Sequence, residues 1–488
     1  MTSSLVAMAI IFGIILLAAV TGLYSGRHRQ MNLEQWTVAG RGFGLIFVWL
    51  LMAGEIYTTF AFLGACGWVY SRGGPTLYIL AYLTLAYVVS FFILPEIWEA
   101  GRKFTLHTQP DFFQQRYGNR YLASFVAIVG VIFIVPYLQL QLTGLGIIVG
   151  VASFGTISRP LAMLIAFVVV AGFVFASGIR AVAWVSVLKD ALMLIAAFSI
   201  GIGIPYHYFG GIRPLFKVLV QLKPAHLTMP GGTVHMGHAW YISTVLLTAL
   251  GGFMWPHTFG STFSAKSGET LRRNAVIMPL YMITLPLLFF VGFAAVLVLP
   301  GLKNGDLALL TLVRQTYPAW FLGVIGGAGA LTAMVPAAIL ILSAATLFAK
   351  NFFRPLFRPA MSDDAVARMA KIVVVVITGV ALSFAIFSTI SLVGLLLLAY
   401  AGIAQFFPGV MFGLYWKRVT GAGVFAGLLA GVGLAMLLVF SKHDPFHGLN
   451  AGFLALCVNA ALTVVVSVLT PAEENGLEAL SPQVAAGG

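Results

Sequence analysis

Long apolar stretches separated by short polar ones recur along the whole chain. Most are about 20 residues or longer, the length that a helix needs to cross the hydrocarbon core of a bilayer. Stretches of this length predict membrane-spanning helices. We count thirteen of them, at residues 4–24, 43–71, 75–97, 120–150, 158–179, 181–207, 238–265, 275–300, 320–350, 369–389, 390–415, 419–440 and 446–470.

Composition supports an all-α polytopic membrane protein. Of the 488 residues, 60% are hydrophobic and only 8% are charged, too few charges to keep a soluble protein of this length hydrated. The formal net charge of +13 fits basic cytoplasmic loops better than a nucleic-acid partner. The two cysteines, Cys66 and Cys457, lie in apolar runs, which argues against a disulfide framework or a metal site.

Basic clusters predict how the chain is oriented in the membrane. Arg27, Arg29 and Arg41 follow the first segment, and further clusters occupy 101–103, 266–273 and 350–358. The positive-inside rule makes these loops cytoplasmic. The protein is therefore expected in the plasma membrane, with its N-terminus outside and its C-terminus in the cytoplasm.

Short loops predict a single transmembrane domain over residues 1–470, with a core repeat at about 43–415. The tail 471–488 is polar and acidic, which is typical of a disordered cytoplasmic segment.

Two apolar segments are interrupted in corresponding places. The second contains "MAGEIYTT" with Gly54, and the seventh contains "TALGGFMWPHTF" with Gly251-Gly252, five segments later. Paired interruptions of this kind indicate the binding site of a transporter built from a five-plus-five inverted repeat. A simple glycine or proline kink is the alternative for each break.

Several stretches resemble the sodium:solute symporter family. They are "TVAGRGFG", "LPEIWEAGRKFTLHTQPDFFQQRYGN", "GIRAVAWVSVLKDALML", "MWPHTFGSTFSAKSGETLRRNA" and "AYAGIAQFFPGVMFGLYWKRVTGAGVFAGLLAGV", in family order from about residue 35 to 435. The resemblance implies an inverted-repeat bundle of thirteen or more helices with broken first and sixth core helices. "GEIYTTFAFLG" and "PYLQLQLTGLGIIVG" look most like the monocarboxylate permease branch, whose substrates include lactate and pyruvate. One departure is Gly423-Val424, where the family usually has Gly-Ala.

The resemblance also implies a sodium site between the first and eighth core helices. It assigns backbone carbonyls to Gly54, Tyr57 and Thr332, and two side-chain hydroxyls to the positions of Val335 and Pro336. Neither Val335 nor Pro336 has a side-chain oxygen for a hard cation. The fifth core helix reads "WVS" at 184–186, where the family often has "WTD", so an aspartate is missing as well.

We interpret a nearby lysine as a substitute for the cation that these missing oxygens would bind. Lys189 lies nine residues beyond Arg180, about 13 Å along a helix at 1.5 Å per residue, and Glu55 lies at the first break. A charged group at the bilayer centre costs at least ~2.5–3.5 kcal/mol, and burial favours the neutral form of both groups. We expect H⁺ coupling with Lys189 and Glu55 as candidate carriers. The alternatives are a permanent Glu55–Lys189 pair, a Lys189–Asp190 pair, or Na⁺ at a modified site.

Polar and aromatic side chains near the breaks are candidate substrate contacts. Thr58 and Thr59, at the start of the half-helix after the first break, can hold an anion. His257, beside the second break, can titrate near neutral pH. Helix back-bonding and ordinary structural hydrogen bonds are the alternatives. At a spacing of two, at most one of the two candidate glutamines faces the pocket. The candidates are Thr58, Thr59, Gln139, Gln141, Trp255, His257, Tyr400 and Gln405.

Together these features predict a secondary active symporter that imports small monocarboxylates such as lactate or pyruvate with a cation, H⁺ favoured over Na⁺. Its expected partners are a small organic anion and the lipid bilayer, with no cofactor and no obligate protein partner. A Na⁺-coupled symporter for another small solute, such as an amino acid, and a membrane solute sensor remain alternatives. The absence of HExxH and GxSxG motifs argues against an enzyme.

Overall fold

The computed structural model describes residues 2–26, 39–176, 179–231 and 236–471, and these residues form helices joined by short connections. Extended pairing in this part of the chain is limited to the isolated bridges Phe43–Ala265 and Phe446–Leu449. The first helices are α1 (Ser3–Gly26), η1 (Ala39–Arg41), α3 (Leu45–Ile56), η2 (Phe60–Gly64), α4 (Ala65–Arg72), η3 (Gly74–Leu77), α5 (Tyr78–Lys103), α6 (Gln109–Tyr117), α7 (Arg120–Ala152), α8 (Arg159–Ala176), α9 (Ile179–Phe209), α10 (Ile212–Leu222) and η4 (Pro224–Leu227).

The second half continues in the same way. Its helices are α11 (His238–Gly251), α12 (Pro256–Ser264), α13 (Gly268–Ile277), η5 (Met278–Ile283), α14 (Thr284–Val298), η6 (Gly305–Leu307), α15 (Ala308–Thr316), α16 (Ala319–Thr346), η7 (Leu347–Phe353), α17 (Arg354–Phe357), α18 (Asp363–Phe387), α19 (Leu392–Ile403), α20 (Phe406–Tyr415), α21 (Gly421–Phe440) and α22 (Ala451–Leu469).

The all-helical membrane architecture is confirmed. In the described ranges nine helices or helix runs are long and apolar enough to cross a membrane, and two bent pairs raise the number to eleven. The other two predicted segments, 158–179 and 238–265, correspond to α8, whose described apolar part is short, and to the α11–α12 pair. The count of thirteen and the inverted repeat therefore stay predictions.

Both predicted interruptions are places where a helix stops. α3 ends at Ile56, Tyr57 leaves the helical conformation (φ −91°, ψ 75°), and the axis bends by 56° before the chain continues in η2 and α4. In the seventh segment α11 ends at Gly251 and α12 starts at Pro256, a residue that suits the first helical position because it lacks an N–H. A third bend, of 44° between α19 and α20, was not expected.

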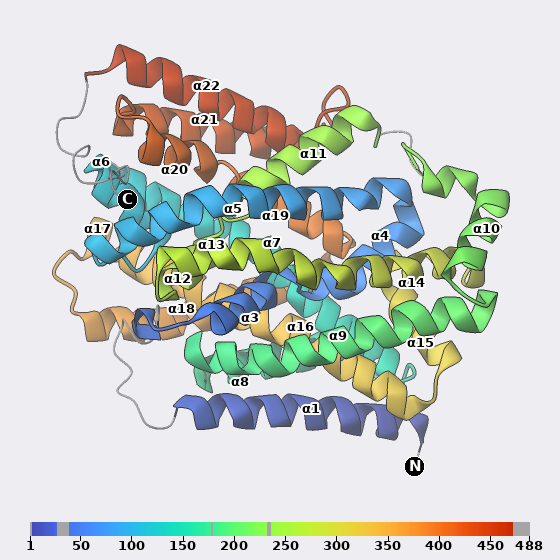
Figure 1. The fold of residues 1–488 in the computed structure, drawn as a ribbon. Coiled ribbons are helices and arrows are strands. Elements are labelled where there is room, and N and C mark those ends of the chain that lie inside the picture. The colour runs from blue at the N-terminus through green and yellow to red at the C-terminus, as the bar shows by residue number, and fades with distance from the viewer. Residues whose placement is uncertain (1, 27–38, 177–178, 232–235, 472–488) are drawn as a thin grey trace, which may run out of the picture.

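The helices lie side by side along one common direction (Figure 1). α7 packs against α16 and α19, α9 packs against α14 and α16, and α21 packs against α22. Glycine permits one close approach that matters for the site: a Cβ at Gly54 would lie 2.8 Å from Ser186 Oγ, so α3 and α9 can touch only because that side chain is absent.

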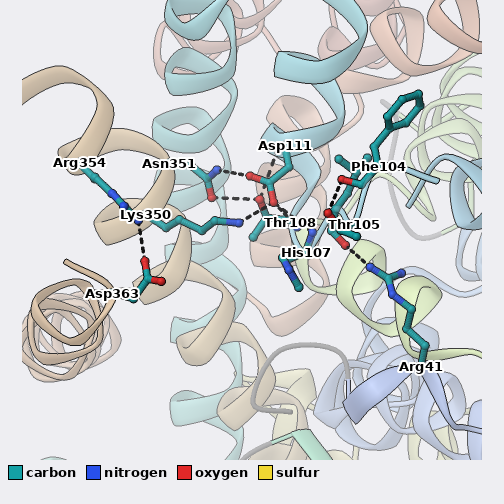
Figure 2. A network of polar contacts seen from close by, with 11 residues as sticks. Arg41, Phe104, Thr105, His107, Thr108, Asp111, Lys350, Asn351, Arg354 and Asp363 are labelled. Carbon is teal, nitrogen blue, oxygen red and sulfur yellow. Dashed lines mark hydrogen bonds and ion pairs between the residues drawn. The ribbon is translucent and has the colours of Figure 1, made fainter. Parts of the chain in front are cut away.

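The two ends of the bundle differ. α1 begins and α10 lies at one end, whereas α6 and α17 lie at the opposite end (Figure 1). We call the latter the basic end, because Arg41, Lys350 and Arg354 gather there (Figure 2). Arg27 and Arg29 of the predicted basic cluster, and residues 472–488 of the predicted tail, lie outside the described residues.

Candidate functional site

The break after α3 exposes backbone carbonyls to α9. Lys189, on α9, is fully buried, and its ammonium lies 3.2 Å from Tyr57 O and 3.4 Å from Ala53 O. The last carbonyls of a helix carry partial negative charge, and Ala53 O does so although it also accepts the N–H of Tyr57 at 2.9 Å. The lysine therefore places a positive charge where a broken helix can hold a cation.

Asp190 is the counter-ion of this lysine. Lys189 Nζ lies 2.7 Å from Asp190 Oδ1, which also accepts a hydrogen bond from Tyr281 OH at 3.0 Å. Both partners are buried. The cost of removing the two charges from water offsets much of their attraction, so such a pair depends on good geometry and additional hydrogen bonds. The sequence left open whether Lys189 forms an ion pair with Glu55 or with Asp190. In the structure Lys189 forms its ion pair with Asp190 and not with Glu55.

Glu55 lies on the last turn of α3 but faces another neighbour. Ser261 Oγ, on α12, donates to Glu55 Oε1, and Tyr137 OH donates to the backbone carbonyl of Glu55 at 3.0 Å. Glu55 Oε2 has no hydrogen-bond partner in the described structure, and the residue is only 3% exposed. An unpaired buried carboxyl oxygen is costly, so this oxygen is available to a proton or a ligand.

The other half of the implied cation site lies on α16. Thr332 donates its hydroxyl to Gly329 O at 2.7 Å, and Val335 and Pro336 are buried in the same helix. α16 packs against both α3 and α9. Beyond the backbone, this face of α16 offers no oxygen at Val335 or Pro336.

A cavity of about 450 Å³ adjoins the break, and we call it the central cavity. Of the predicted substrate residues, Trp255, His257 and Tyr400 line it, together with Glu55. The sequence analysis missed Tyr82, Tyr87 and Tyr137, which also line it. Tyr82 follows Tyr78 by four residues on α5, and this pair of tyrosines on one helix face was the signal that could have revealed Tyr82.

The other predicted substrate residues do not line this cavity and have structural partners. Thr59 Oγ1 donates to Gln141 Oε1 at 2.9 Å. Thr58 Oγ1 accepts from Phe60 N at 3.3 Å and from Tyr137 OH, a lining residue, at 3.5 Å. Gln139 Nε2 lies 3.5 Å from Phe384 O. Gln405 Nε2 donates to Ala401 O and Gly452 O, so it ties the α19–α20 bend to α22.

A second cavity, of about 490 Å³, is lined in part by His107 and Thr108 near the basic end, and we call it the basic-end cavity. His257 lines both cavities. The lining of the basic-end cavity comprises His107, Thr108, Pro256, His257, Gly260, Ile339, Leu342, Ser343, Thr346 and Leu347.

A polar network borders this cavity (Figure 2). Asp111, on α6, accepts from Lys350 Nζ and Asn351 Nδ2, each at 2.7 Å, and Thr108 Oγ1 donates to Asn351 Oδ1 at 3.0 Å. Burial alone would raise the pKa of Asp111, but the charge of Lys350 and these hydrogen bonds hold it below its usual value. The network joins α6 to η7.

Around the network two further contacts lie at the basic end. Arg354 Nη1 pairs with Asp363 Oδ1 at 2.8 Å, and Arg41 Nη2 donates to Leu106 O at 2.8 Å (Figure 2). Among the described residues, no group of three or more His, Cys, Asp and Glu side chains is placed to hold a metal ion.

Comparison with known proteins agrees with this architecture. The chain is 43% identical over 477 residues to the uncharacterized symporter YhjB of Bacillus subtilis, covering 95% of this chain and 97% of that one. It is 31% identical over 485 residues to a monocarboxylate transport permease protein of Rhizobium johnstonii, covering 96% and 97%. A Na⁺-coupled sialic acid symporter has a similar fold, with a TM-score of 0.78, 17% identity, and coverage of 96% and 98%.

The family model for sodium:solute symporters matches residues 36–431, which is most of the chain. This family and the similar folds are transporters, not enzymes. The chain is a multi-pass membrane protein that belongs to the sodium:solute symporter family.

Proposed function

We propose that this symporter imports small monocarboxylates, such as lactate or pyruvate, together with H⁺ rather than Na⁺, by alternating access. The observation that carries the proposal is the position of Lys189 Nζ, 3.2 Å from the carbonyl of Tyr57 at the break of α3. The carbonyl of Tyr57 is one of the three that the family resemblance assigns to a free cation, and it is contacted by a positive charge that belongs to the protein.

Proton transfer can replace ion exchange at such a position. When Lys189 is protonated, its charge balances Asp190 and attracts the carbonyls of Ala53 and Tyr57. When it loses the proton, the attraction to the carbonyls disappears and Asp190 is left as an unpaired buried charge. Since an unpaired buried charge is unfavourable, the neutral state has a strong tendency to take up a proton again. Two charge states of one side chain can thus drive two states of the bundle.

The central cavity suits a small organic anion. Many of its wall residues are aromatic, and its polar groups are few: the hydroxyls of the lining tyrosines and of Thr258, the imidazole of His257 and the carboxyl of Glu55. A sugar needs many donors and acceptors, whereas a monocarboxylate needs a few well-placed donors. The similarity to a monocarboxylate permease supports this substrate class.

Glu55 also favours the joint binding of a proton and a carboxylate substrate. An ionised Glu55 in the lining would repel a carboxylate anion, whereas a protonated Glu55 can donate a hydrogen bond to it. Proton and anion would then bind together. One H⁺ with one carboxylate moves no net charge, so uptake should be electroneutral and insensitive to voltage.

We further propose that the basic end faces the cytoplasm and that residues 1–470 act as one transport domain in the plasma membrane. The positive-inside rule and the clustering of Arg41, Lys350 and Arg354 at that end support this orientation.

Uptake into proteoliposomes tests the coupling ion. Labelled lactate uptake is measured under a pH gradient without Na⁺, and separately under a Na⁺ gradient at equal pH. We expect accumulation only in the first case. Accumulation only under the Na⁺ gradient would establish the Na⁺-coupled alternative, and binding without accumulation in either case would establish a solute sensor. Competition by lactate, pyruvate, acetate and alanine then identifies the substrate class.

A further inference from the structure

The two cavities meet at a single side chain. His257 lines both, and it lies at the start of α12 directly after the break that follows α11. Its ring packs against Trp255 and Tyr137, with ring centroids 5.7 Å and 6.2 Å away. The imidazole is therefore the partition between the central cavity and the basic-end cavity.

His257 also has unused hydrogen-bonding capacity. The residue is 5% exposed, and its Nδ1 has no partner among the described residues. Buried polar atoms are nearly always hydrogen-bonded, so an orphaned nitrogen at the junction of two cavities points to a ligand that comes and goes.

The opposite wall of the basic-end cavity is one face of α16 and η7. Ile339, Leu342, Ser343, Thr346 and Leu347 contribute to the lining at spacings of three and four residues, which places them on the same side of a helix. This wall is amphipathic, with two hydroxyl groups among three apolar side chains.

Most hydroxyls of this cavity already donate to protein acceptors. Thr346 Oγ1 donates to Leu342 O at 2.8 Å, and Thr108 Oγ1 donates to Asn351 Oδ1 at 3.0 Å. The hydroxyl of Ser343 makes no hydrogen bond to another described residue. Ser343 and His257, on α16 and α12, are thus two available polar groups on different elements that border the same cavity.

The lining of the basic-end cavity combines apolar side chains with a few polar groups, as a site for a small organic molecule does. Thr108 of its lining belongs to the polar network at the basic end, where Lys350 pairs with Asp111.

We propose that the basic-end cavity is a second binding site for a small carboxylate, formed by Ser343 and His257. This inference rests on the proposed carboxylate transport. The anion leaves the central cavity past His257, binds at Ser343, and is released at the basic end. Each chain therefore holds two carboxylates at saturation, one on each side of the imidazole.

Equilibrium binding of labelled lactate or pyruvate to the purified full chain tests this site. We expect about two carboxylates per wild-type chain and about one in Ser343→Phe, in which the ring fills the cavity. The affinity of the remaining site should stay within about twofold of the wild-type central site. Net uptake by Ser343→Phe should fall at least tenfold, because the exit is blocked.

Two further variants keep the test decisive. Ser343→Ala removes only the hydroxyl, and the loss of a hydrogen bond to a charged carboxylate, about 1.5–3 kcal/mol, should weaken the second site at least tenfold. Ser383→Phe, on the exposed part of α18, is the matched control and should bind two carboxylates and transport normally. If Ser343→Phe does not fold, the change in second-site affinity of Ser343→Ala decides.

The outcomes separate this inference from the proposed function. Wild-type protein that accumulates carboxylate but binds only one per chain, or equal binding by wild-type and Ser343→Ala protein, would overturn the second site alone. Wild-type protein that neither binds nor accumulates any small monocarboxylate would overturn the proposed function.

Discussion

Lys189 reaches from α9 to the broken end of α3, where its ammonium lies 3.2 Å from the carbonyl oxygen of Tyr57. This contact joins two helices that are 132 residues apart at these positions in the chain. In the proposed mechanism it takes the place of a diffusible ion, and that proposal leads to several testable predictions.

Substitution of the lysine should separate coupling from binding. In Lys189→Gln the charge is lost, so we expect uptake driven by a pH gradient to fall at least tenfold, while exchange of labelled for unlabelled substrate continues. The measurement is uptake and counterflow in proteoliposomes. Lys371→Gln, at an exposed position of α18, is the control, and pH-driven accumulation by Lys189→Gln equal to that of the control would exclude Lys189 as the carrier.

The effect of Lys189→Gln on stability should come mainly from Asp190, which loses its counter-ion. Lys189→Gln leaves Asp190 buried without its counter-ion, and removal of one partner of such a pair costs about 3–5 kcal/mol. The double variant Lys189→Gln, Asp190→Asn removes both charges and should recover most of the loss. Thermal unfolding in detergent measures the difference, and a double variant no more stable than the single one would contradict the pairing.

Glu55→Gln should abolish the pH dependence of substrate binding. The amide cannot ionise, yet it can still accept the hydrogen bond from Ser261. We expect the KM for lactate to become independent of external pH between about 5 and 8, whereas KM rises with pH in the wild type. Glu269→Gln, on the exposed pair with Arg273, is the control. A Glu55→Gln protein that does not fold, although Ser261→Ala does, would assign Glu55 to holding the helix in shape.

Asp306, which lies outside the membrane spans, should make the stability of the protein depend on pH. It lies in η6, is 4% exposed, and accepts a hydrogen bond from Leu392 N at 3.0 Å. Burial raises its pKa from 3.8 to about 6, although that hydrogen bond opposes the shift. The folded state therefore binds the proton more tightly, and the contribution of Asp306 to stability falls as pH rises from about 4 to about 6 and is constant above that.

Asp306→Asn tests this sign. The amide that replaces the carboxyl keeps an acceptor for Leu392 N but never ionises, so the variant should gain stability relative to wild type at pH 8 compared with pH 4, by about 3 kcal/mol at 1.36 kcal/mol per pKa unit. Thermal unfolding at the two pH values measures it. An unchanged difference between the two proteins at both pH values would exclude Asp306 as the titrating group.

The ion pair of Asp111 with Lys350 should hold α6 against η7. Asp111→Asn weakens charged hydrogen bonds that are worth about 1.5–3 kcal/mol each, so hydrogen exchange of the α6 amides should become at least tenfold faster. Asp363→Asn disrupts the pair with Arg354, in which the aspartate side chain is 75% exposed, and such pairs contribute little. Equal effects of the two substitutions would contradict a special role for the Asp111 network.

Much of the fold was predictable because bilayer thickness imposes long apolar runs and glycine marks the breaks. Eleven predicted segments correspond to spans or bent pairs, and helices stop after Ile56 and Gly251, within two residues of the expected positions. Lys189 is fully buried and contacts the carbonyl of Tyr57, but its depth in the bilayer and the cation site of the family resemblance stay predictions.

The rest of the site depends on which helices become neighbours. Gln405 was chosen as a polar residue in an apolar helix, but its amide bonds to α22, a helix that its local sequence does not specify. Glu55 likewise finds Ser261 on α12 rather than Lys189. Such partners arise from tertiary packing, which periodicity along one segment does not encode.

The absent side chain of Gly54 lets α3 approach α9 closely enough for Lys189 to reach the carbonyls. In the proposed mechanism this cation is tethered, so it can neither be diluted nor depleted by the medium. A cell that depends on such a carrier could continue to feed on organic acids in sodium-poor water, where a sodium-driven relative would stop.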